Sequence, residues 1–99
     1  MTETYTPDNW VIVRIPHEDK HIYKVVAGWS GGYLHGDSWR VNSGIIHIED
    51  CGDSYRFHGE SGSVYKCRKD CEFERANIHG VLNTLRQHGA VVIKVGEMK

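Results

Sequence analysis

The side chains best suited to hold a ligand gather in one glycine-rich stretch, residues 28–40. It contains four glycines, the rings of Trp29, Tyr33 and Trp39, and the guanidinium group of Arg40. Glycine lets a ligand come close to main-chain N–H groups, aromatic rings offer flat faces for stacking, and arginine offers a planar fork of donors. A ligand with a base and a phosphate needs this mixture. The alternative is a surface loop whose tryptophan rings fold back into the core, because tryptophan is highly buried on average.

Small polar residues add hydrogen-bond donors for a phosphate, as backbone nests do. A second polar turn, residues 59–63, joins neighbouring antiparallel strands and can lie at the same end of the sheet, with Arg56 and His58 just before it. The predicted ligand-binding residues are Trp29, Ser30, Gly31, Gly32, Tyr33, Ser38, Trp39, Arg40, Arg56, His58, Ser61 and Ser63.

Metal binding and catalysis have weaker support in the sequence. Cys67 and Cys71 are three residues apart, but a tetrahedral zinc site usually shows a second close pair of ligands, so we expect no metal and no cofactor. Imidazole can act as acid and base near neutral pH, so a phosphodiester-cleaving site using His35, His47 or His58 is an alternative. Scattered histidines are usually surface residues, and we lean towards a protein without catalysis.

Composition indicates one domain, residues 1–99, by the usual ~100–200 residues per domain. The formal net charge is −1, from 12 Lys+Arg and 13 Asp+Glu. A dedicated nucleic-acid binder usually shows a basic excess, so this balance disfavours that class, although small bent sheets with exposed aromatic rings do bind single strands.

The N-terminal residues, the hydropathy and the number of cysteines indicate the cellular compartment. Residues 1–5 are polar and lack the regions of a signal peptide, and no segment approaches the ~18 apolar residues of a membrane span. Three cysteines are an odd number for a disulfide framework. We therefore expect a cytoplasmic protein with reduced thiols and no membrane contact.

The elements that must position these residues are mostly strands. After a polar lead-in at residues 1–8, strand-like runs cover 10–15, 21–27, 39–49, 54–58 and 63–67, and a final one covers 90–95. The first run is apolar on both faces, which indicates an interior strand. Helical spacing of Ile78, Val81, Leu82 and Leu85 predicts one helix, with Asp70 as its N-cap and Gly89 past its end.

The fold class that follows is α+β. We predict a strongly bent antiparallel sheet or small barrel of about six strands, with one C-terminal helix before the last strand. Asn42-Ser43-Gly44 interrupts the run 39–49, and an internal glycine in a strand marks a bulge or a sharp bend.

Residues 27–34, 36–45 and 61–67 resemble a group of small uncharacterised accessory proteins of tailed bacteriophages. The resemblance covers about residues 10–67 and brings no activity residue by residue. It implies a context, because small accessory phage proteins often counter host defence, and several are oligomeric sponges for cyclic or ADP-ribose-type nucleotide signals.

On this basis we predict a phage-encoded anti-defence protein that sequesters a nucleotide-derived immune signal in the host cytoplasm without catalysis. A domain of this size offers only a shallow site by itself, so we expect a dimer or a higher homo-oligomer. The alternatives are an inhibitor that docks on a host enzyme, a single-stranded nucleic-acid-binding module and a small phosphodiesterase.

Overall fold

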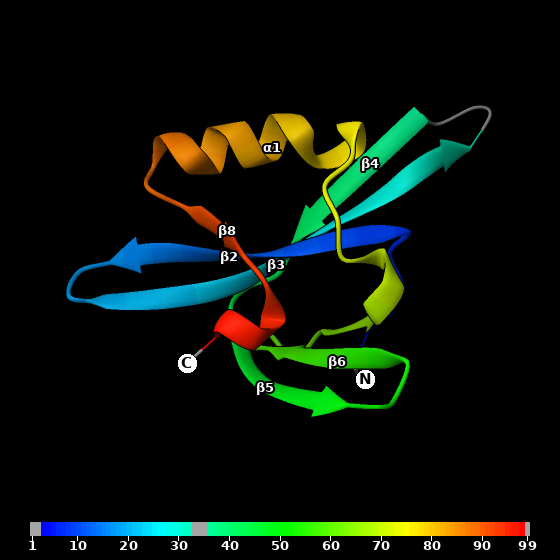
Figure 1. Ribbon diagram of the computed structural model, residues 1–99, viewed down its shortest axis with the longest axis horizontal. Coiled ribbons are helices and arrows are strands. Elements are labelled where there is room, and N and C mark those ends of the chain that lie inside the picture. The colour runs from blue at the N-terminus through cyan, green and yellow to red at the C-terminus, as the bar shows by residue number, and fades with distance from the viewer. Residues whose placement is uncertain (1–2, 33–35, 99) are drawn as a thin grey trace.

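Two four-stranded sheets and one helix are stacked in three layers (Figure 1). The computed structural model describes residues 3–32 and 36–98. The helix-covered sheet has the strand order β4 (Gly36–Val41), β3 (Lys20–Gly32), β2 (Asn9–His17) and β8 (Val91–Ile93). The outer sheet has the order β1 (Thr4–Tyr5), β7 (Val64–Arg68), β6 (Ser54–Gly59) and β5 (Ile45–Asp50). Helix α1 (Ala76–Gln87) lies on the first sheet, and two short 3₁₀ turns, η1 (Lys69–Cys71) and η2 (Val95–Glu97), complete the elements.

Strand β2 is buried on both faces, which confirms that it is an interior strand. Successive side chains of a strand point to opposite faces. Trp10 and Ile12 point into the core between the sheets, whereas Val11 and Val13 pack against α1. The strand is paired with β3 on one side and β8 on the other.

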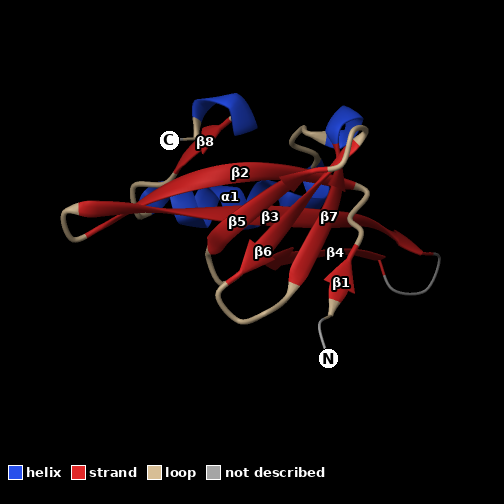
Figure 2. Cartoon of the chain, turned by 90° about the horizontal axis from the view of Figure 1, so that it is seen from below, coloured by secondary structure: helices blue, strands red, loops and turns tan. Residues whose placement is uncertain are grey.

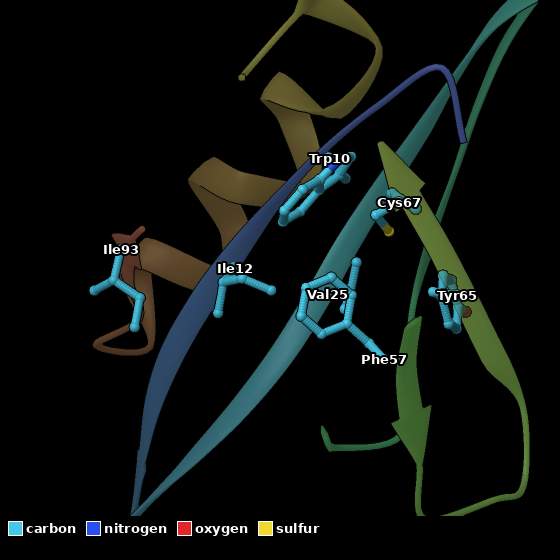
Figure 3. Packing of buried hydrophobic residues seen from close by; sticks show 8 residues of the cluster. Trp10, Ile12, Val25, Phe57, Tyr65, Cys67 and Ile93 are labelled. Atoms are coloured by element: carbon cyan, nitrogen blue, oxygen red, sulfur yellow. The ribbon is translucent and has the colours of Figure 1, made fainter. Parts of the chain in front are cut away.

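The core between the two sheets is aromatic (Figure 3). Trp10 lies 5.3 Å from Phe57, centroid to centroid, and its indole Nε1 donates to the carbonyl oxygen of Arg68 at 2.8 Å. Tyr65 and Cys67 of β7 and Val25 of β3 fill the same layer. Apolar burial of these large side chains holds the sheets together, at about 25 cal/mol per Å² removed from water.

The run 39–49 bends as predicted, but it bends into a different sheet. At Asn42 the chain leaves β4, and at Ile45 it enters β5. The Asn42 side chain accepts from the main-chain N–H of Val25 at 2.9 Å, and the main-chain N–H of Asn42 donates to the Val25 carbonyl at 3.1 Å. Gly44 has a φ of 138°, a conformation that favours glycine. Within the described residues the two sheets are not closed into a barrel, so the barrel alternative is wrong. The α+β class holds.

The helix begins later than predicted. Its N-cap is Arg75, without a side-chain capping bond, and Asp70 lies in η1 instead. The chain must first travel from the outer sheet to the far side of the helix-covered sheet, and Glu72 forms an isolated bridge with Trp10 on the way. Helix α1 approaches β3 so closely that a Cβ on Gly28 would lie 2.7 Å from the Asn77 side chain.

The two ends of the chain add strands at sheet edges. Part of the predicted lead-in forms β1, which pairs in parallel with β7. The last strand, β8, is shorter than the predicted run 90–95 and lies at the edge beside β2. Among the described residues, no helix has the length and apolar character needed to cross a membrane.

Candidate functional site

The β3–β4 hairpin separates the two tryptophans of the predicted site. Trp29 is paired with Ser38 and Gly28 with Trp39, and directly paired residues share a face, so Trp29 and Trp39 point to opposite faces of the sheet. The Trp29 ring packs against the inter-sheet core and its Nε1 donates to the Thr6 carbonyl at 3.1 Å. Trp39 is 54% exposed, on the face that carries α1. These two rings therefore do not enclose one ligand.

Arg40 is engaged in an aromatic cluster at the edge between the two sheets. Its guanidinium carbon lies 4.6 Å from the centroid of the Tyr5 ring. The Tyr5 ring lies 6.3 Å from Trp29 and 5.0 Å from Tyr65. Burial raises the pKa of Tyr65 to about 12, against the opposing effect of the Arg40 charge. This cluster joins β1 and β4 and so has a structural role.

Ser30 of the hairpin already makes hydrogen bonds within the protein. The main-chain N–H of Ser30 donates to the Asp8 carboxylate at 2.8 Å, and the Ser30 hydroxyl accepts from Arg75 at 3.5 Å. Gly31 and Gly32 end β3 at an irregularity in its pairing with β4. Ser38 is exposed, and the predictions for Tyr33 and His35 lie outside the described residues.

The second polar turn lies away from the hairpin tip. The main-chain N–H of Ser61 donates to the Ser43 hydroxyl at 2.9 Å, and the hydroxyls of Ser61 and Ser63 are 3.5 Å apart. Ser43 lies two residues past the end of β4, whereas the hairpin tip precedes the first residue of β4. A six-residue strand is about 20 Å long, so Ser61 and Ser63 do not join the hairpin in one site.

Arg56 and His58 lie on the uncovered side of the outer sheet, which Figure 2 shows from below. Tyr55 and Phe57 point into the core, so Arg56 and His58 point outwards. Strand pairing brings polar residues of β5 and β7 beside them. We call this surface the outer face; it comprises His47, Glu49, Ser54, Arg56, His58, Lys66 and Arg68.

A histidine–glutamate pair marks one end of the outer face. The Nε2 atom of His58 lies 2.6 Å from Oε1 of Glu49, and the rings of His58 and His47 are 5.3 Å apart. The hydrogen bond from His58 lowers the pKa of Glu49. With Glu49 ionised, Nε2 carries the shared proton, and Nδ1 of His58 is the ring nitrogen that this bond leaves available.

A mixed-charge pocket of about 520 Å³ lies at the other end of the outer face. Lys66 and Arg68 line it together with the hydroxyl residues Thr6 and Ser54. Ser54 is 2% exposed, and its hydroxyl has no hydrogen-bond partner among the described residues. The remaining lining residues are Pro7, Asp8 and Asp53. Arg68 also pairs with Asp70 at 3.0 Å.

A second, more apolar hollow of about 400 Å³ adjoins His47 at the edge of β5. Its lining side chains are Tyr23, Ile45, Ile46, His47, Ile48 and Met98. The outer face therefore has the mixed-charge pocket at one end. The apolar hollow opens beside His47 at the free edge of β5, where most of its lining side chains also pack against the core between the sheets.

Cys67 and Cys71 do not belong to the outer face, whereas the exposed Cys51 lies beside it and its main-chain N–H donates to the Ser54 carbonyl at 2.8 Å. Cys67 is fully buried, and burial raises the pKa of its thiol. Burial also raises the pKa of Cys71. Within residues 3–32 and 36–98, no group of three or more histidine, cysteine or acidic side chains has an arrangement that could hold a metal ion.

Sequence reasoning missed Glu49, Ser54, Lys66 and Arg68. Their signal is readable, because polar residues occupy every second position on three successive strands. Comparisons with protein-family models, curated proteins and solved structures found no match to this chain. The resemblance to phage accessory proteins stays a prediction.

Proposed function

We propose that this protein binds a phosphorylated, nucleotide-like small molecule on its outer face. The observation that carries the proposal is the pocket in which Lys66 and Arg68 stand beside the unpartnered Ser54 hydroxyl. Phosphate oxygens prefer charged donors, and arginine offers two parallel N–H groups to them. A hydroxyl without a partner is costly to bury. The Ser54 hydroxyl is buried in the pocket wall, so a ligand oxygen satisfies it once the side chains over it move aside.

The acidic residues of the pocket suit the sugar of such a ligand. Carboxylates accept hydrogen bonds from neighbouring hydroxyl groups, as a ribose diol would supply. Asp53 and Asp8 both line the pocket, and Asp8 already accepts from the Ser30 N–H. A simple inorganic anion would gain nothing from these two carboxylates, so the mixed charge favours a sugar phosphate.

This proposal moves the ligand from the hairpin to the outer sheet and keeps its chemical class. If the protein acts in phage infection, as the resemblance implies, the ligand is a nucleotide-derived immune signal held in the host cytoplasm. Cation–phosphate contacts supply most of its affinity, so binding weakens as salt rises.

Thermal shift and calorimetry with ADP-ribose and a cyclic dinucleotide test the proposal. We expect one of these probes to raise the Tm of the wild type, and Lys66→Glu to abolish the rise. Lys20→Glu, at the exposed first residue of β3, is the matched charge control and should keep the rise in Tm.

Trp39→Ala distinguishes a ligand site on the outer face from a ligand site at the hairpin. We expect this variant to keep the ligand-induced rise in Tm, because Trp39 lies on the helix-covered sheet. Loss of the rise in Trp39→Ala, with Lys66→Glu unaffected, would return the site to the hairpin and overturn the proposal.

A further inference from the structure

We propose that the outer face also cleaves phosphodiesters that carry a neighbouring hydroxyl group, as RNA does, with His58 as general base and His47 as general acid. This inference rests on the proposed function, because it uses the same phosphate-binding surface. The two histidines are directly opposite each other on β5 and β6, and their ring centroids are 5.3 Å apart. Two imidazoles at this spacing can both reach one phosphate group above the sheet, one for each proton transfer.

Glu49 is the positioning residue of this site. Its carboxylate accepts a hydrogen bond from the Nε2–H group of His58 at 2.6 Å, which fixes the orientation of the ring and presents Nδ1 to the substrate. When Nδ1 takes up a proton, the same carboxylate stabilises the imidazolium that forms. A base held by a third group in this way is the general arrangement of activated acid–base pairs.

Two cations adjoin the histidines to meet the charge that develops on the phosphate. Arg56 is paired with Glu49 on one side and Lys66 on the other, one row along the sheet from His58. The three strands therefore present base, acid and cations on one rigid surface. Preorganised charges of this kind usually give the largest single contribution to catalysis.

The two hollows determine which part of the substrate lies at which end of the site. The apolar hollow beside His47, with the Tyr23 ring in its wall, fits a base. The pocket of Lys66 and Ser54 fits the next phosphate and sugar along the chain. A substrate that spans both is at least a dinucleotide.

The reaction needs no co-reactant. Nδ1 of His58 removes the proton of the 2′-hydroxyl while that oxygen attacks phosphorus and forms the new P–O2′ bond. The P–O5′ bond breaks, and the leaving 5′-oxygen takes a proton from protonated His47. The products are a 2′,3′-cyclic phosphate and a free 5′-hydroxyl, and proton exchange with water restores both histidines.

The test uses a short end-labelled RNA and the DNA of the same sequence. We expect the full chain to cleave RNA to fragments with 2′,3′-cyclic phosphate ends and to leave the DNA intact. His47→Ala and His58→Ala should each lower the rate by at least about 100-fold, with melting curves to show that they remain folded. His79→Ala is the matched control, because His79 also pairs with a glutamate, Glu74, at 2.8 Å, but lies on α1.

Glu49→Gln tests the positioning role separately. We expect it to lower kcat with little change in KM, since Glu49 does not touch the substrate. A merely structural role for Glu49 would instead change the Tm and leave kcat unchanged.

The outcomes distinguish this inference from the proposed function. Equal cleavage of DNA, or RNA cleavage that persists in both histidine variants, overturns the catalytic assignment. Ligand binding that depends on Lys66, without any cleavage of RNA, overturns the inference and leaves the proposed function standing. Cleavage without any Lys66-dependent binding overturns the proposed function alone.

Discussion

Gly80 occupies the middle of α1 without any packing reason to be glycine. A Cβ built there would meet no heavy atom of the described residues within 4 Å. Because glycine costs a helix about 1 kcal/mol relative to alanine, we expect Gly80→Ala to raise the free energy of unfolding by up to about that amount. Urea denaturation measures it. Gly28→Ala is the contrasting case, since its Cβ would lie 2.7 Å from Asn77, and it should destabilise.

Glu74 makes the stability of the protein sensitive to acid. The hydrogen bond from Arg86, at 3.0 Å, and the one from His79 lower the pKa of Glu74 below its ordinary value in the folded state. A carboxyl with a lowered pKa stabilises the fold above its unfolded pKa, and that contribution is lost as the pH falls through the folded pKa. We expect Glu74→Gln to cost no more than about 1 kcal/mol at pH 7, because the groups are partly exposed.

The difference between wild type and Glu74→Gln should disappear as the pH falls below the folded pKa of Glu74. Thermal melts from about pH 7 down to about pH 2.5, well below the ordinary glutamate pKa, measure it. A difference that stays constant over this range would show that the ion pairs of Glu74 contribute nothing.

At the scale of elements, the crossing at residues 42–44 is the joint between the sheets. Gly44 combines a φ of 138° with a close approach of the Glu60 carboxylate, which would lie 2.8 Å from a Cβ at this position. We expect Gly44→Ala to destabilise the fold by about 1–3 kcal/mol. Gly96→Ala, without positive φ and with open space around it, is the control. Equal stability of the two variants would contradict the role of Gly44.

The sequence predicted the strands well, because their polar–apolar alternation is a local property. The runs at 54–58 and 63–67 match β6 and β7 to within one residue at each end, whereas the runs at 10–15 and 21–27 start within one residue of β2 and β3 but end two and five residues too early. The sequence also shows the break at 42–44. A β-bulge within one sheet and a crossing to the other sheet have the same local sequence pattern, so the sequence does not distinguish them. Asp70 and Glu72 are residue types that often begin a helix. In the structure Asp70 lies in η1 and Glu72 pairs with Trp10, so both belong to the connection that precedes α1.

The candidate site was less predictable than the fold, because it depends on register. Alternation with Tyr55 and Phe57 places Arg56 and His58 on one face of a strand. Their contacts with Glu49 and His47 depend on the pairing of β5 with β6, which shifts by one residue between Ile45 and His47. A slip of one residue moves every side chain to the other face, and no local signal shows where such a shift occurs.

At the scale of the whole molecule, self-association stays a prediction. The outer face is a shallow surface, and a second copy would deepen it. Ile46, 66% exposed at the free edge of the outer sheet, is an apolar side chain that such a contact would cover. We expect native mass spectrometry at micromolar concentration to show a dimer that Ile46→Lys weakens. A wild type that is monomeric throughout would contradict the expectation.

The strands at the two ends of the chain pair with partners far away in the sequence, β1 with β7 and β8 with β2. Strands β2 to β4 and strands β5 to β7 are each joined by short connections, so each group can form early from local contacts. Thr4 pairs with Val64, 60 residues further along the chain. Closing so long a loop costs conformational entropy before the contacts between the strands can offset it. The pairing of β8 with β2 closes a still longer loop, so we expect both terminal strands to dock late. Until β1 docks, the Tyr65 ring lacks its contact with the Tyr5 ring, and tyrosine fluorescence should report a late phase of refolding.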